Sequence, residues 1–150
     1  MKKLLLFALL VLSFNLIAQD RMEFLGIYFS NSSKEFQKQL EEIGFEYTGD
    51  YYYTGEFMGY IRLVDFIPSC IEDEIYKLTL TCTHFNSEKA IEDYNRIKNE
   101  LTYKNSYWDV SYCYCIIYLN SGEIDLIIEN NKVIIEFIDK ISEERILKQK

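Results

Sequence analysis

The residues of this chain best equipped for chemistry are its four cysteines and its single histidine. Cys82-x-His84 and Cys113-x-Cys115 carry the sulfur and nitrogen ligands that bind zinc in a tetrahedron. The four side chains would converge if two neighbouring strands carried the two pairs. The spacing matches no established zinc finger, however, and the N-terminal leader described below places the thiols in an oxidising compartment. We therefore expect no metal and no other cofactor.

Nucleophilic catalysis needs a general base beside a serine or a cysteine, and His84 is the only histidine of the chain. The sequence holds no Gly-x-Ser-x-Gly turn, no phosphate-binding glycine loop and no His-Glu-x-x-His pair. Three consecutive carboxylates, at Glu72, Asp73 and Glu74, could act in acid–base chemistry or bind calcium weakly. They lack the spaced loop that makes calcium binding specific. The sequence therefore predicts a protein that is not an enzyme.

The cysteines also allow disulfides. Cys113 and Cys115 lie two residues apart in a strand-like run, so their side chains point the same way and do not bond easily to each other. Two pairings remain, each of which links Cys70 or Cys82 to one member of the close pair. The alternative is that some of these residues are buried small apolar side chains. Two disulfides, one and none all stay open.

The run from 112 to 119 sorts its side chains onto two faces. Tyr112, Tyr114 and Tyr118 share one face, and the cysteines share the other, which we expect to pack against helices. Tyrosine gives a large contact area at a low entropic cost, so the tyrosine face is a candidate protein-binding surface that Trp108 and Tyr52 would extend. Stacking on a sugar ring is a second interpretation. Half-buried cross-strand pairing, with no binding role, is a third.

Residues 1–18 have the three-part layout of a secretory signal peptide. Lys2 and Lys3 precede an aliphatic run from Leu4 to Leu12, and a polar stretch ends at Ala18. The apolar run is shorter than the roughly 20 residues that span a membrane, and no cysteine follows it for lipid attachment. We expect cleavage near Ala18, an exported protein in the periplasm or outside the cell, and no membrane insertion after cleavage.

Composition limits the range of partners. The formal net charge is −8, and loss of the leader with its two lysines would make it −10. Such a chain repels phosphate backbones, which excludes nucleic acid and anionic membrane surfaces as partners. Abundant tyrosine and phenylalanine with one proline favour sheet over disorder. After the leader, 19–150 is long enough for a single domain with its own core.

Apolar periodicity and turn residues predict strands separated by two main helices. Ser32 and Glu35 form a capping box before the first helix, and Gly44 ends it. Asn86 caps the second helix. The expected apolar faces of the two helices are Phe36, Leu40 and Ile43, and Ile91, Tyr94, Ile97 and Leu101.

Strand patterns surround both helices. The last three expected strands form a meander with turns at 120–122 and 130–131, and Ser142 begins a short final helix. The expected strands are 24–29, 45–47, 51–54, 56–66 with a bend at Gly59, 75–84, 112–119, 124–129 and 133–138. This order predicts an α+β domain, a curved antiparallel sheet with two main helices on one face. The repeated order of elements further predicts a tandem βαββ duplication.

Several packing motifs resemble those of small, functionally uncharacterised exported proteins of Bacteroides-type bacteria. The motifs cover most of 24–140 and include the strand at 24–27, the Gly55-x-Phe57-x-Gly59-Tyr60 pattern, and the late strands at 122–128 and 137–139. This resemblance implies an α+β fold similar to that of β-lactamase inhibitor proteins. An inhibitory role would follow from that likeness at the level of the fold alone.

These observations together predict an exported, non-catalytic binding module. Its partner would be a protein of the cell envelope or the extracellular space, bound through the open face of the sheet, and the role could be inhibitory or immunity-like. The alternative function is a small-ligand binding protein of the envelope, for glycan or lipid.

Overall fold

The structure is a computed structural model that describes residues 21–49, 52–68, 73–105, 108–111 and 113–148. The expected leader at 1–18 lies outside the described residues. Among the residues that are described, none of the helices combines the length and the apolar character that crossing a membrane requires.

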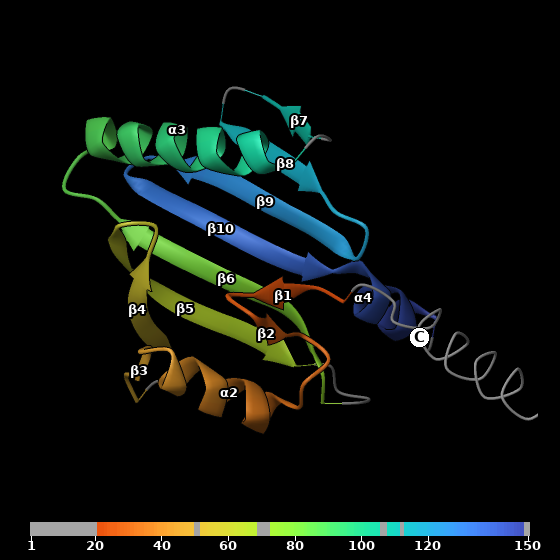
Figure 1. The fold of residues 1–150 in the computed structure, drawn as a ribbon. Helices are drawn as coiled ribbons and strands as arrows, with labels where there is room; N and C mark the ends of the chain where they lie inside the picture. Colours follow the sequence, from red (N-terminus) through yellow and green to blue (C-terminus); the bar gives the residue numbers. More distant parts are fainter. Residues whose placement is uncertain (1–20, 50–51, 69–72, 106–107, 112, 149–150) are drawn as a thin grey trace, which may run out of the picture.

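Eight antiparallel strands form one open sheet with the order β3-β4-β5-β6-β10-β9-β8-β7 (Figure 1). Each neighbouring pair in this order is antiparallel, which confirms the expected α+β class with an antiparallel sheet. The strands are β3 (Glu46–Tyr47), β4 (Tyr53–Phe57), β5 (Tyr60–Pro68), β6 (Ile75–Thr83), β7 (Trp108–Val110), β8 (Tyr114–Tyr118), β9 (Gly122–Glu129) and β10 (Lys132–Asp139).

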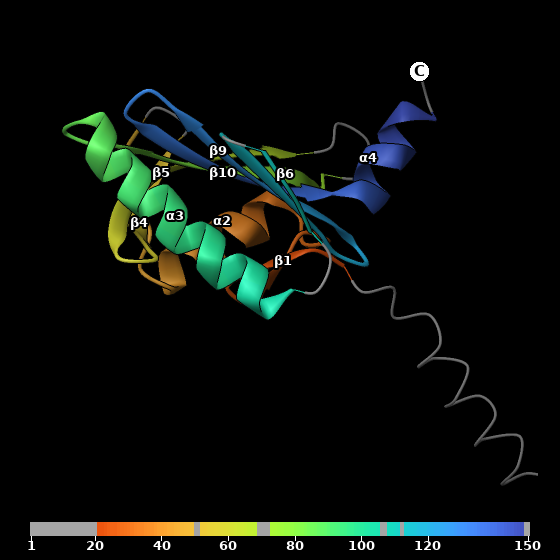
Figure 2. The same cartoon turned by 90° about the horizontal axis from the view of Figure 1, so that it is seen from above.

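The two faces of the sheet are covered to different extents: two helices and a hairpin lie on one face, whereas on the other only α4 (Lys140–Leu147) contacts the described strands, at the end where Ile138 is buried. Helices α2 (Ser33–Glu42) and α3 (Ser87–Lys104) lie on the same side of it, together with the hairpin of β1 (Glu23–Phe24) and β2 (Ile27–Tyr28) (Figure 2). We call this side the helix face and the opposite side the open face. Buried residues of the central strands, such as Leu80, Ile135 and Leu126, alternate with partly exposed ones, so the core lies between the helix face and the helices.

The N-terminal segment differs from the expected single strand at 24–29. Leu25 and Gly26 both have positive φ, 51° and 83°, and they turn the chain so that Phe24 pairs with Ile27 in a separate two-stranded sheet. The prediction of one continuous strand was wrong because Leu25, a residue that disfavours positive φ, occupies a turn position. Phe24 and Ile27 nevertheless enter the core.

Helix α2 begins where its cap predicts. The Ser32 hydroxyl accepts a hydrogen bond from the Glu35 amide at 3.3 Å, and Gly44 follows the helix with φ 96°. Phe36 and Leu40 are buried as expected. Ile43 follows the helix as its C-terminal cap and is 43% exposed, so it does not belong to the buried face as expected.

Helix α3 also begins at its predicted cap. The Asn86 side chain accepts a hydrogen bond from the Lys89 amide at 2.9 Å. Tyr94, Ile97 and Leu101 are buried, but Ile91 is 48% exposed. The buried stripe instead includes Ala90 and Asp93, which puts a charged residue in the core.

Two hairpin details complete the sheet. Gly59 does not bend a long strand as expected: Met58 and Gly59, with φ of 50° and 78°, form the tight turn between β4 and β5. The last three long strands form the predicted meander, and α4 (Lys140–Leu147) follows β10 directly, with an Asp139 carboxylate oxygen accepting from the Ile141 amide at 3.0 Å. The tandem duplication stays a prediction.

Candidate binding surface

One row of side chains crosses the open face from β5 to β8. Strand register pairs Leu63 with Thr81, Thr81 with Ile134, Ile134 with Ile127, and Ile127 with Tyr114. Directly paired residues project on the same side of a sheet. The row is therefore apolar at four of five positions, although no described helix lies over it (Figure 2).

The most exposed part of the open face is the side of β5. Ile61, Leu63 and Ile67 alternate with the buried Arg62 and Val64, and they are 67%, 41% and 40% exposed. Ile61 and Leu63 are neighbours on this face, and Asp65 separates them from Ile67. Exposed aliphatic side chains that lie together in this way differ from the single scattered apolar residues of an ordinary surface. We call Ile61, Leu63 and Ile67 the β5 strip.

Acidic side chains border the apolar row. Alternation places these carboxylates on the open face: Glu56, Asp65, Glu123, Asp125, Glu129 and Glu136. The lysines on the described strands of this face are Lys77, whose ammonium lies 2.7 Å from Glu136, and Lys132. Lys140, which belongs to α4, also pairs with this face: its ammonium lies 2.9 Å from the Glu123 carboxylate. Acids therefore outnumber bases around an apolar centre.

Asp125 is the buried member of this acidic border. It is 8% exposed, and one of its carboxylate oxygens accepts a hydrogen bond from the Tyr114 hydroxyl at 2.9 Å. The other oxygen has no partner among the described residues. Burial raises the pKa of Asp125, and the nearby charges of Glu123 and Glu136 raise it further, whereas the Tyr114 hydrogen bond lowers it.

The structure distributes the five predicted aromatic site residues over different surfaces. Tyr114 lies on the open face but is half-buried and held by Asp125. Tyr118 lies at the end of the same strand and is 37% exposed. Trp108 pairs with Ile117 and so belongs to the helix face, at the β7 edge. Tyr52 adjoins β4 near the opposite edge of the sheet, and Tyr112 lies outside the described residues.

The histidine lies in a buried charged cluster that the sequence did not predict. His84 Nε2 lies 3.0 Å from a carboxylate oxygen of Asp93, and Cys82 offers a thiol within 4.8 Å of both. The same carboxylate accepts two hydrogen bonds from Arg62, at 2.8 and 3.1 Å, and one from Arg96 at 2.6 Å. We call Arg62, Cys82, His84 and Asp93 the buried cluster.

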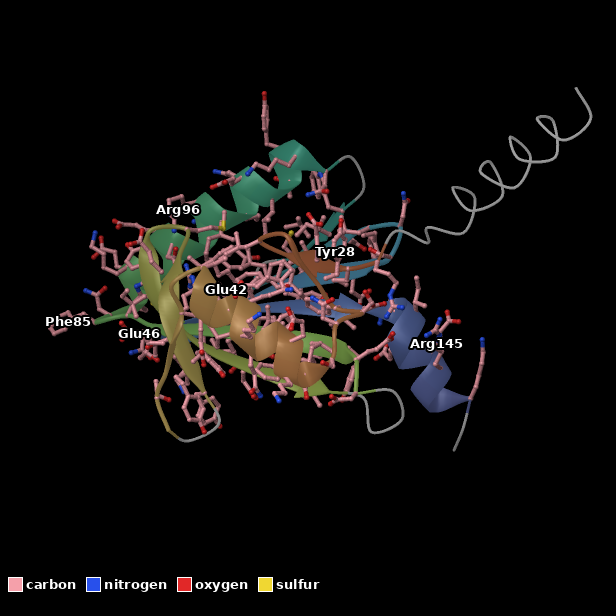
Figure 3. The ribbon with its side chains drawn as sticks, turned by 60° about the horizontal axis from the view of Figure 1, so that its bottom comes forward. Tyr28, Glu42, Glu46, Phe85, Arg96 and Arg145 are labelled. Atoms are coloured by element: carbon pink, nitrogen blue, oxygen red, sulfur yellow. The ribbon has the colours of Figure 1, made fainter. Side chains whose placement is uncertain are left out.

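The buried cluster joins α3 to the β4–β5 turn. Arg62 Nε donates to the Phe57 carbonyl at 3.1 Å, and Arg96 donates to the Met58 carbonyl, so two cations from different elements hold this turn. Figure 3 labels Arg96 on α3. The Tyr60 ring packs edge-on against His84 at 4.8 Å and lies beneath both guanidinium groups.

The chemistry of the buried cluster favours a structural role over a metal or a nucleophile. The Asp93 carboxylate is already surrounded by two guanidinium groups, which would repel a cation. Burial raises the pKa of the Cys82 thiol, and the Asp93 charge raises it further despite the opposing effect of Arg62. A neutral, buried thiol is neither a good zinc ligand nor an activated nucleophile.

The three described cysteines form no disulfide, which is one of the outcomes that the sequence left open. Cys82 pairs with Val133, Val133 with Ile128, and the Ile128 amide donates to the Cys113 carbonyl, so two strands separate the cysteines. Three strand spacings put the backbones of Cys82 and Cys113 about 14 Å apart, which is twice the largest Cα–Cα distance that a disulfide allows, about 7 Å. Cys82 is therefore not linked to Cys113 or Cys115, and these three thiols are free. Cys70 lies outside the described residues. The same separation excludes a zinc site built from Cys82, His84, Cys113 and Cys115.

The sequence interpretation missed the β5 strip, Arg62 and Asp93. The run 60–68 is apolar at nearly every position, so alternation did not indicate its orientation, and Arg62 occupies the buried phase. Asp93 follows Ala90 and precedes Tyr94 and Ile97, and this spacing was the available signal that it faces the core.

No protein-family model, curated protein or solved structure matches this chain. The resemblance to small exported proteins of Bacteroides-type bacteria stays a prediction.

Proposed function

We propose that this protein is a non-catalytic binding module that binds a basic protein through the open face of its sheet. The observation that carries the proposal is the exposed β5 strip beside an acidic border, on the face that α2 and α3 leave uncovered. The proposal retains export through the leader at 1–18, which would place the partner in the envelope or outside the cell.

The two components of the surface have different roles in binding. The β5 strip supplies apolar area whose removal from water favours association by about 25 cal/mol per Å². The acids supply a negative field that attracts a basic partner and speeds its approach. Glu136 and Glu123 already have lysine partners, so Glu56, Asp65 and Glu129 are the carboxylates of this face for which a partner's cations would matter most.

The form of this surface favours a protein over a glycan. Sugar rings stack on exposed aromatic faces, but the exposed centre here consists of aliphatic side chains. Tyr114, the aromatic residue of the row, is half-buried and bound to Asp125. The aromatic residues expected to provide stacking at Trp108 and Tyr52 lie on another face and near another edge.

The test begins with capture of a partner from envelope extract by the protein without residues 1–18, followed by expression of that partner in pure form. We expect a one-to-one complex that weakens as sodium chloride rises from 50 to 500 mM. Hydrogen exchange of the complex should show protection in β5, β6 and β10.

Leu63→Lys and Ile61→Lys separate this proposal from nonspecific capture. Both positions are exposed, so the fold tolerates the change, and each variant should weaken the complex at least tenfold. Phe85→Lys is the matched control because Phe85 is 98% exposed, precedes α3 and points away from the sheet (Figure 3). Equal weakening by Phe85→Lys, protection of another face, or self-association through β5 would overturn the proposal.

A further inference from the structure

A groove lies on the helix face between α3, β9 and two residues that precede β8, Ser111 and Cys113. Its volume is about 400 Å³, within the range of small-molecule pockets. Ile91 from α3 and Ile128 from β9 form its apolar walls, and Asn95, Asn130 and Ser111 form a polar rim. None of the described residues that line it is acidic, although the chain has a net charge of −8.

Tyr94 lines this groove with a hydroxyl that has no hydrogen-bond partner in the described part of the chain. The residue is 2% exposed. Burial raises the pKa of Tyr94 to about 12, and the nearby Cys115 and Cys113 raise it as well, so the hydroxyl keeps its proton. A buried hydroxyl without a partner is costly, and an acceptor in the groove would remove that cost.

Lys98 lies one helical turn after Tyr94 and lines the same groove. Its ammonium lies 5.3 Å from the centre of the Tyr94 ring. Among the described residues, no carboxylate lies within ion-pair distance of this ammonium. A charged donor and a neutral donor therefore line the same groove as two apolar side chains, Ile91 and Ile128.

We propose that this groove binds a small carboxylate with a short apolar tail. The carboxylate would accept hydrogen bonds from the Lys98 ammonium and the Tyr94 hydroxyl, and the tail would lie along Ile91 and Ile128. Cys113, whose thiol is exposed, forms part of the wall beside the ligand. This inference is independent of the proposed protein-binding role, because the groove and the open face lie on opposite sides of the sheet.

Octanoate is the probe, and octan-1-ol is its neutral counterpart with the same tail. Titration at pH 7, followed by amide chemical shifts, should show saturable binding with changes confined to α3, β8 and β9. We expect octan-1-ol to bind at least tenfold more weakly. Octanoate should also slow alkylation of Cys113 by iodoacetamide, measured by peptide mass spectrometry.

Two variants test the two donors. Lys98→Met and Tyr94→Phe should each weaken octanoate binding about tenfold, the loss expected for one hydrogen bond to a charged group. Tyr94→Phe removes a hydroxyl that has no hydrogen-bond partner among the described residues, so the variant should be as thermally stable as the unaltered protein. A purely structural tyrosine would show neither the loss of binding nor this stability.

Lys104→Met is the matched control, because Lys104 is on the same helix but pairs with Glu100 at 2.8 Å. It should bind octanoate as the unaltered protein does. The proposal is overturned if octanoate does not bind at 10 mM, if octan-1-ol binds equally well, or if all three variants bind alike. None of these results bears on the open face, so the two proposals fail separately.

Discussion

Asp93→Asn should be strongly destabilising because it leaves the Arg62 guanidinium buried without a countercharge. Both side chains of this pair are fully buried, 2.8 Å apart. Removing one partner of a buried ion pair costs about 3–5 kcal/mol. Asparagine keeps an acceptor for Arg62 and His84, so we expect the lower value, about 3 kcal/mol. That is a large fraction of the roughly 5–15 kcal/mol that stabilises a typical domain.

Urea unfolding of the protein without residues 1–18, followed by circular dichroism at pH 7, measures this loss. Arg62→Met should cost less, because Asp93 keeps its contacts with Arg96 and His84. The double variant Arg62→Met/Asp93→Asn removes both charges and should be more stable than Asp93→Asn alone, so the two effects are not additive.

Glu92→Gln is the matched control for loss of a carboxylate on α3. Glu92 pairs with Lys89, but both side chains are 56% exposed, so the loss should be below about 0.5 kcal/mol. If Asp93→Asn cost less than about 1 kcal/mol, or if the double variant lost the full sum of the single changes, the buried pair would not be what joins α3 to β5.

Three further outcomes follow from other contacts. Asp125→Asn should raise the free energy of unfolding at pH 7 by about 0.5 kcal/mol, since it removes like-charge repulsion across strands. The folded-state pKa of Asp125 is raised, so the ionised form opposes folding at neutral pH, and this gain should vanish as the pH falls from the raised value through the ordinary 3.8. Gly122→Ala should lower the free energy of unfolding by about 1–3 kcal/mol, measured by chemical denaturation, because the added Cβ would collide with the backbone carbonyl of Ile138. Zinc should leave the melting temperature of the protein unchanged in a thermal scan, because guanidinium groups already surround the carboxylate of the buried cluster; a rise would contradict its structural role.

The sequence predicted well those elements that local chemistry determines. The caps at Ser32 and Asn86 and the stop at Gly44 depend on contacts within one turn, and the structure has all three. The expected strand at 75–84 is present as β6, where Leu78 and Leu80 are buried and alternate with polar residues. The errors occur where a residue adopts a backbone conformation that its type disfavours, as Leu25 does with its positive φ.

The candidate surface was harder to predict because its pattern is ambiguous. In the run from 60 to 68, both phases of the strand carry aliphatic residues, so hydrophobicity does not show which side faces the core. Arg62 reverses the usual expectation, because its charge is neutralised by Asp93, which lies 31 positions later in the chain. Pairing over such a distance leaves no local signal. The pairing of the cysteines stayed open for a related reason: the order of the strands in the sheet determines which cysteines lie close together, and the sequence does not show that order.

The buried cluster and the proposed binding face are physically connected through β5. Arg62 lies between Ile61 and Leu63, and alternation sends its side chain into the core while theirs point outward. The contacts of Arg62 with Asp93 and the Phe57 carbonyl therefore fix the strand that presents the β5 strip. A charged residue in the buried phase costs free energy that an aliphatic residue would not. The hydrogen bonds of Arg62 to the Phe57 carbonyl and to Asp93 hold the β4–β5 turn against α3. An apolar side chain at this position could make no directional bond to that backbone, so it would not fix the exposed strand in the same way.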